Sequence, residues 1–255
     1  MFVDSHCHLN FPELAADLDS VVATMESNAV THALCVSVNL ETLSQVLSIA
    51  ERFANIFASV GVHPDNQGGE EPDIRRLRAL AEHPRVVAIG ETGLDYYRLK
   101  GDLDWQRDRF RCHIRAARES GLPLIIHTRD AAADTLRIMK EENAAECGGV
   151  MHCFTETREV ANAAMEMNFL ISFSGILTFK NALALKDVAR TVPLENMLIE
   201  TDSPYLAPVP YRGRTNQPAY VHFVAEEVAR LKEVPVVAVA NATTTNFFDL
   251  FQVAA

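Results

Sequence analysis

The sequence predicts an α/β fold, a single (β/α)8 barrel with its active site at the carboxyl ends of the strands. Short apolar runs rich in β-branched residues recur at the spacing of strand–helix units, and the stretches between them have helical periodicity with charged faces. The chain has 255 residues, close to the roughly 250 of one such barrel. No linker composition interrupts it, so we expect one domain over residues 1–255.

Eight short apolar segments fit buried parallel strands. In chain order they are Phe2–Ser5, His32–Val38, Ile56–Gly61, Val86–Gly90, Pro123–His127, Gly149–Phe154, Phe169–Phe173 and Met197–Thr201. Amphipathic helices are expected between them at Leu14–Asn28, Glu41–Phe53, Asp73–His83, Trp105–Ser120 and Ala131–Glu142, and after them at Ala219–Lys232 and Pro235–Phe251. The loop Ser203–Pro218 is longer than most connections, and long loops at this face of a barrel usually carry function.

The overall charge and cysteine content restrict the possible partners and location. A net charge of −11 argues against a broad basic face for nucleic acid, although a local site for one phosphate stays possible. The five cysteines are scattered without a C-x-x-C pair, which disfavours disulfides and thiolate zinc. With no secretion signal or membrane span in the sequence, we expect a cytoplasmic protein, a monomer, without a membrane partner.

Polar residues recur at the carboxyl ends of the predicted strands, where packing does not require them. They are His6, His8, His63, Glu91, His127, His152, Glu200 and Asp202. Because all strands of a barrel run parallel, these ends converge on one face. Residues far apart in the sequence are therefore expected to meet there. The remaining histidines, His32, His83, His113 and His222, lie elsewhere and are expected to be structural.

The residues of this set are suited to binding divalent metal ions. His6 and His8 share one face of a strand because side chains alternate, whereas Cys7 points to the packing layer. Imidazole with carboxylate is the ligand mix of zinc, manganese or iron. Four histidines with Glu91 and Asp202 exceed one tetrahedral shell, so two ions sharing a bridging carboxylate are expected, with Glu91 as the bridge.

Such a centre would hydrolyse its substrate with activated water. Two ions about 3.5–4 Å apart polarise a phosphoryl or carbonyl oxygen and lower the pKa of water. Asp202 is the candidate general base, and Glu200, two residues earlier on the same face, is expected to orient other groups. No G-x-S-x-G elbow, P-loop or G-x-G-x-x-G fingerprint suggests another chemistry.

The motifs resemble those of the TatD-type metal-dependent deoxyribonucleases, in the amidohydrolase-like superfamily. The matching segments run the length of the chain: Asp4–Leu9, Gly61–Pro64, Gly90–Tyr96, His127–Ala131, His152–Phe154, Ser172–Gly175 and Glu200–Leu206. The resemblance implies a TIM-type barrel that hydrolyses phosphodiester bonds in DNA, typically with magnesium, with 3'-5' exonuclease activity in relatives. Magnesium, manganese and zinc are thus the candidate metals.

The resemblance also divides the metal ligands into two groups. It implies one ion held by His6, His8, Glu91 and Asp202, and a second held by Glu91, His127 and His152. It places His63 near the substrate, binding phosphate or assisting proton transfer.

Further substrate contacts are expected from loops at the same face. The candidates are Arg129, Arg212 and Tyr205, with Arg214 and Lys180 as weaker ones. Tyr96, Tyr97, Phe154, Phe179 and Tyr211 are further candidate stacking platforms for bases. Many relatives carry Asn-Glu-Pro where this chain has Asn216-Gln217-Pro218, which removes a charge beside the expected substrate entrance.

Two other functional hypotheses are alternatives to a deoxyribonuclease. The same metals would serve an esterase, an amidase or a phosphoesterase acting on a small molecule, because the preference for DNA rests on the resemblance. A catalytically silent protein whose metals stabilise the barrel is disfavoured, since fewer ligands would close a structural site.

Overall fold

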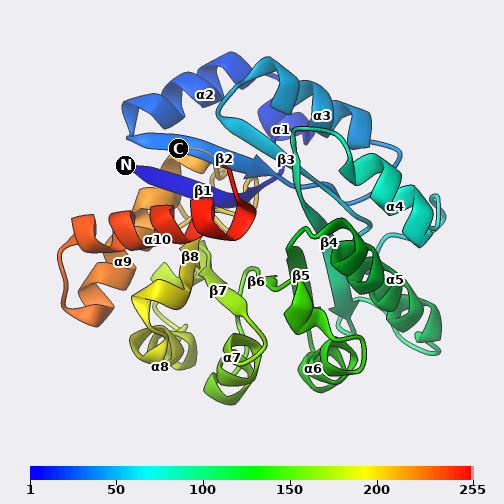
Figure 1. Cartoon of the computed structure of the whole chain (residues 1–255). Coiled ribbons are helices and arrows are strands. Elements are labelled where there is room, and N and C mark those ends of the chain that lie inside the picture. Colours follow the sequence, from blue (N-terminus) through cyan, green and yellow to red (C-terminus); the bar gives the residue numbers. More distant parts are fainter. Residues whose placement is uncertain (254–255) are drawn as a thin grey trace.

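Eight parallel strands follow one another in sequence order around a barrel in the computed structural model, which describes residues 1–253 (Figure 1). The strands are β1 (Phe2–Cys7), β2 (Val30–Cys35), β3 (Ile56–Val60), β4 (Val86–Asp95), β5 (Leu124–Arg129), β6 (Gly149–Met151), β7 (Phe169–Phe173) and β8 (Met197–Ile199). Beyond β8, the chain meets β1 again, since the amide of Asp202 donates to the carbonyl of His6 and that of His8 to the carbonyl of Ser203, at 3.0 and 2.8 Å. The predicted barrel is confirmed.

The largest differences from the predicted strands concern their ends. β4 continues five residues past the predicted end at Gly90, because its ladder with β5 goes on through the pair of Asp95 and Arg129. Glu91 therefore lies inside a strand rather than after one. β6 and β8 end earlier than predicted, at Met151 and Ile199, so their polar residues lie on the loops that follow. A polar side chain neither ends nor prolongs a ladder of backbone hydrogen bonds.

Helices cover the outside of the barrel. They are α1 (Pro12–Ala15), α2 (Leu18–Ser27), α3 (Leu43–Arg52), α4 (Ile74–Ala81), α5 (Asp104–Ser120), α6 (Ala132–Glu141), α7 (Arg158–Met165), α8 (Leu183–Thr191), α9 (Val221–Lys232) and α10 (Val236–Phe251). Short 3-10 turns occur at η1 (Ala144–Glu146), η2 (Gly175–Thr178), η3 (Leu194–Asn196) and η4 (Pro218–Tyr220). Within residues 1–253, no helix combines the length and the hydropathy that crossing a bilayer requires.

The one long helix predicted at Leu14–Asn28 is wrong, because Asp17 divides it. Asp17 has φ −148° and ψ 63°, outside the helical region, and its side chain accepts a hydrogen bond from the amide of Ser20. This is an N-cap, which supplies a partner for one of the free amides of the first turn. Helical periodicity continues through the break, so the apolar pattern alone did not reveal it.

Two apolar layers hold the barrel together. The larger lies between strands and helices and includes Cys7, which is fully buried, as expected, and donates to the carbonyl of Leu34. The other contains inward-facing strand residues such as Val3, and Phe247 and Phe251 from α10 pack against them. Figure 1 shows α10, in red, crossing the barrel beside β1 and β8, which it contacts. The barrel interior is thus closed by the last helix.

We expect Phe247→Ala to lower the free energy of unfolding by about 3–5 kcal/mol, because it leaves a cavity among fully buried side chains. Urea unfolding followed by circular dichroism measures the change. Val237→Ala is the matched control, since Val237 lies on the same helix but is 62% exposed. A loss for Phe247→Ala no larger than that of the control would contradict this role of α10.

Candidate metal centre

A cavity of about 510 Å³ opens where the strands end, and most of the predicted site residues line it. From the predicted set these are His8, His63, Glu91, His127, Arg129, His152, Asp202 and Tyr205. His6 and Glu200 are fully buried beneath them. Arg212 does not line this cavity; its guanidinium lies over the ring of Phe179, 3.8 Å from the centroid, so a role for it in substrate binding stays a prediction.

The first group of possible ligands gathers around the seam between β1 and the chain after β8. The Nε2 atoms of His6 and His8 are 3.3 Å apart. Nε2 of His6 is 3.4 Å from Oε2 of Glu91, and Nε2 of His8 is 3.3 Å from Oδ1 of Asp202. Four residues from three different stretches of the chain thus bring nitrogen and oxygen atoms together at this seam.

The second group gathers around the other oxygen of Glu91. Oε1 lies 2.9 Å from Nε2 of His152, 3.1 Å from Nδ1 of His127 and 3.3 Å from Nε2 of His63. The two oxygens of one buried carboxylate therefore face two different sets of imidazoles. This is the arrangement that a bridging ligand requires, and His63 stands only slightly farther from this oxygen than the two expected ligands do.

Hydrogen bonds to the far side of each ring orient two of the imidazoles. Nδ1 of His8 lies 3.2 Å from the carbonyl of Val36, and a carbonyl can only accept, so the proton sits on Nδ1 and the lone pair of Nε2 faces the cavity. His152 is arranged in the same way by Oε1 of Glu200, 3.2 Å from its Nδ1. Glu200 also accepts from the amide of Cys153 at 2.8 Å. Glu200 thus contacts His152, an expected metal ligand, on the side of the ring that faces away from Glu91. The sequence predicted that Glu200 orients other groups.

Two carboxylates missed by the sequence analysis orient two further rings. Oδ2 of Asp95 lies 3.1 Å from Nε2 of His127, which leaves Nδ1 for the cavity. Asp65 contacts Nδ1 of His63 in the same manner. Such outer partners fix the tautomer and strengthen the ligand. A signal for Asp95 existed, because it follows Glu91 by four positions in one strand and so shares its face.

The electrostatics of the centre depend on burial and on the density of charge. Burial would raise the pKa of Glu91, but His152, His63 and His127 hold it well below its ordinary value. Burial likewise lowers the pKa of His6, helped by His152, whose ring stacks on it at 3.9 Å. Burial alone would lower the pKa of His152, yet Glu91 and Glu200 raise it well above its ordinary value. The carboxylate of Glu91 is thus ionised, and nearby positive charge stabilises it.

Hydrogen bonds among the donor atoms do not satisfy all of them, whereas divalent metal ions would. Nε2 of His152 is buried without a hydrogen-bond partner among the described residues, although Oε1 of Glu91 lies 2.9 Å away. With Nδ1 of His8 protonated, Nε2 of His8 directs a lone pair into the cavity, 3.3 Å from Nε2 of His6, and Nδ1 of His6 is also buried without a partner among these residues. Buried polar atoms without partners are costly, and a divalent cation would supply the missing partner. The residues present therefore suit imidazole–carboxylate metal coordination.

Tight backbone packing behind Glu91 holds it in position. A Cβ atom at Gly61 would lie 2.6 Å from Cα of Gly90, and one at Gly90 would lie 2.7 Å from Cβ of Ile125. Gly90 also has φ +151°, which other residues rarely adopt. Two glycines thus let β3, β4 and β5 approach closely at the point where β4 delivers its carboxylate.

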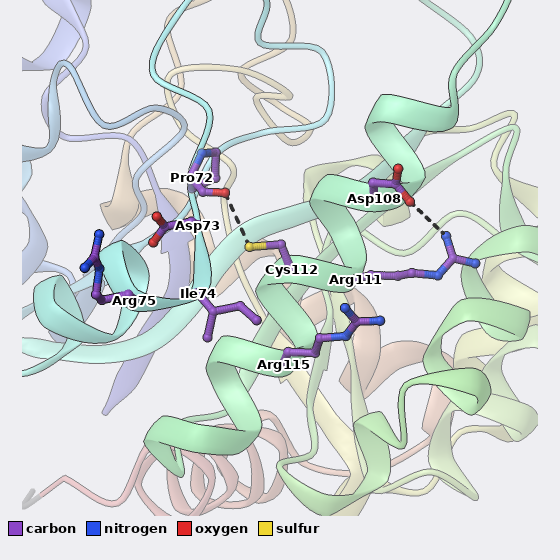
Figure 2. A pocket seen from close by; sticks show the side chains of 8 residues that line it. All are labelled: Pro72, Asp73, Ile74, Arg75, Asp108, Arg111, Cys112 and Arg115. Atoms are coloured by element: carbon purple, nitrogen blue, oxygen red, sulfur yellow. Dashed lines mark hydrogen bonds and ion pairs between the residues drawn. The ribbon is translucent and has the colours of Figure 1, made fainter.

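A second hollow, of about 500 Å³, lies outside the barrel between α4 and α5 (Figure 2). Figure 2 shows Cys112 donating to the carbonyl of Pro72, and Asp108 paired with Arg111, along its wall. No predicted site residue lines it. Its size matches that of the cavity at the strand ends, but its chemistry does not.

The barrel and its donor set define the class of the chain, a metal-dependent hydrolase. More narrowly, the TatD related DNase family matches residues 3–252, and the chain belongs to this family.

Individual relatives agree with this assignment. The chain is 49% identical to the uncharacterized metal-dependent hydrolase YcfH of Escherichia coli K12, over 98% of this chain and 96% of that protein. It is 32% identical to the 3'-5' ssDNA/RNA exonuclease TatD of Enterobacter lignolyticus, over 98% and 99%. The crystal structure of the TatD homologue YjjV from Escherichia coli superposes with a TM-score of 0.92 at 27% identity, covering 99% of this chain and 98% of that one.

We expect Asp95→Asn to weaken metal binding about 10- to 100-fold, because His127 loses the carboxylate that orients it. Calorimetric titration of metal-stripped protein with manganese or zinc measures the affinity. Asp104→Asn is the control, since Asp104 is an exposed carboxylate that pairs with Arg107 on the outer helix α5. Equal affinities for the two variants would refute the orienting role of Asp95.

Proposed function

We propose that this protein is a metal-dependent phosphodiesterase that cleaves DNA with an activated water molecule. The observation that carries the proposal is the position of Glu91, whose two oxygens face the group of His6 and the group of His127 and His152 at the bottom of one cavity. Phosphodiester hydrolysis is the reaction that paired metal sites of this kind serve in nucleases.

The metal ligands of the proposal are those predicted from the sequence. His6, His8, Glu91 and Asp202 would hold one ion, and Glu91, His127 and His152 the other. When bound, two divalent ions, magnesium, manganese or zinc, would polarise the phosphoryl oxygen and make water acidic enough to attack at neutral pH.

Side chains of the protein would transfer the protons and position the phosphate. Asp202 accepts the proton of the attacking water at a carboxylate oxygen, because burial is outweighed by His8 and His6, which lower its pKa and keep it ionised. His63, with Nε2 beside Glu91 and Nδ1 against Asp65, contacts the phosphate or gives a proton to the leaving oxygen. Burial opposes protonation of His63, but Glu91 and Asp65 raise its pKa to about 9, so it carries a proton at neutral pH.

DNA as the substrate is supported by the family and by one relative. The family is described as DNases, and the relative from Enterobacter lignolyticus is named a 3'-5' exonuclease for single-stranded DNA and RNA. A net charge of −11 agrees with a substrate held locally at the cavity rather than along a basic face. We extend the proposal to a monomer acting in the cytoplasm, in keeping with its five unpaired cysteines.

A small phosphoester or carboxylic ester is the second candidate substrate. It is favoured by the limited volume of the cavity, about 510 Å³, which falls within the range of small-molecule sites. The same metals would serve it.

Turnover of labelled single- and double-stranded DNA, beside a panel of small phosphodiesters and esters, tests the proposal. Metal-stripped protein re-supplied with magnesium, manganese or zinc is the enzyme. We expect DNA cleavage that depends on added metal. Cleavage of small esters without cleavage of any DNA would favour the second candidate instead.

We expect Glu91→Ala to lower kcat for DNA by about a thousandfold or more, because both metal groups lose a shared ligand. Circular dichroism checks that the fold is retained. Glu82→Ala is the control, since Glu82 is an exposed glutamate on the loop before β4. Near-normal turnover by Glu91→Ala would rule out the bridging role.

A further inference from the structure

Positive charge in the cavity comes from one side. Apart from histidines, the cationic residues that line it are Arg98 and Arg129. Arg98 follows β4, and Arg129 ends β5. The opposite wall, formed by the segments after β1 and β8, offers Phe11, Tyr205 and Leu206 instead. In a ring of eight strands, β4 and β5 stand across from β8 and β1.

Arg129 is a half-buried cation without an acidic partner. Within residues 1–253 it forms no ion pair, and its side chain donates no hydrogen bond. Its guanidinium stacks on the ring of Tyr97, with Cζ 3.8 Å from the centroid. Stacking occupies the flat face of a guanidinium, whereas its N–H groups point outward in the plane. Arg129 is therefore held in place with donors still available.

Arg98 is held by a single acidic contact. Its Nη1 donates to Oδ2 of Asp65 at 2.8 Å, while 62% of the side chain stays exposed. The remaining donors of the guanidinium are available for an anion. Tyr97, on which Arg129 stacks, directly precedes Arg98 in the chain and is itself 56% exposed.

The hollow in Figure 2 provides a comparison. Arg111 lies 2.8 Å from Glu141 and 3.6 Å from Asp108, and Arg115 lies 2.7 Å from Glu142. Neighbouring carboxylates neutralise these two arginines of α5, so their charge does not favour binding of an external anion. In the part of the chain that the structure describes, no carboxylate pairs with Arg129 in this way.

We propose that Arg129, assisted by Arg98, forms a subsite for a second phosphate group of the substrate, next to the one that is cleaved. The preferred substrate would then be an oligonucleotide that carries a further phosphate beside the scissile diester, rather than an isolated diester. A guanidinium can bind a phosphate through two hydrogen bonds. Because the opposite wall is largely apolar, we expect the second phosphate to bind on the β4–β5 side of the cavity. This inference rests on the proposed phosphodiesterase function.

Thymidine dinucleotides test the subsite. TpT has only the scissile phosphate, whereas pTpT and TpTp carry a second one at either end. We expect wild-type kcat/KM to be about 10- to 100-fold higher for one phosphorylated form than for TpT, the effect of a charge-assisted hydrogen bond. Arg129→Gln should reduce that ratio to near one, and Arg129→Lys should restore part of it. Arg75→Gln, an exposed arginine of α4, is the control and should keep the ratio.

A binding measurement separates failure of the subsite from failure of the proposed function. Calorimetry with thymidine 3',5'-bisphosphate and metal-free protein should show weaker binding by Arg129→Gln than by Arg75→Gln. Equal wild-type cleavage of TpT, pTpT and TpTp would overturn the subsite and leave the phosphodiesterase intact. If no dinucleotide or DNA is cleaved with any metal, the proposed function fails, and equal binding by the two variants would then refute the subsite as well.

Discussion

The buried carboxylate of Glu91 is the constraint on which the rest of the site depends. A negative charge that is 2% exposed is stable only if positive or proton-donating groups surround it, and here four imidazoles do so. Those imidazoles come from four separate strand ends. The close glycine packing of β3 against β4 sets where the carboxylate stands, and the partners behind His63, His127 and His152 set which nitrogen faces it.

The fold followed from the sequence because its main signals are local. Alternation of apolar strands and amphipathic helices is a property of neighbouring residues, and it located all eight strands. The break at Asp17 and the extension of β4 to Asp95 escaped it, since a capping hydrogen bond and a ladder to another strand leave the apolar pattern unchanged. Strand ends are set by partners, and the partners were unknown.

Part of the candidate site could also be predicted from the sequence, because the positions of strand ends follow from local patterns. Residues at strand ends converge in any parallel barrel, so His6, His127 and Asp202 could be grouped without knowing their distances. Loop residues obey no such rule. Arg212 lies on Phe179 away from the cavity lining, whereas Arg98 reaches the cavity from a loop that no motif marked. The hydrogen bond between His8 and the carbonyl of Val36 depends on the rotation of the imidazole ring, which the sequence does not determine.

The hydrogen bond between the amide of Asp202 and the carbonyl of His6 joins the two ends of the strand order. His6 and His8 leave the ribosome first, and Asp202 follows almost two hundred residues later. A nascent chain therefore cannot assemble the first metal group until its last strand has emerged. Any chain that ends before Asp202 would therefore carry this group of ligands without its carboxylate from the last turn of the barrel.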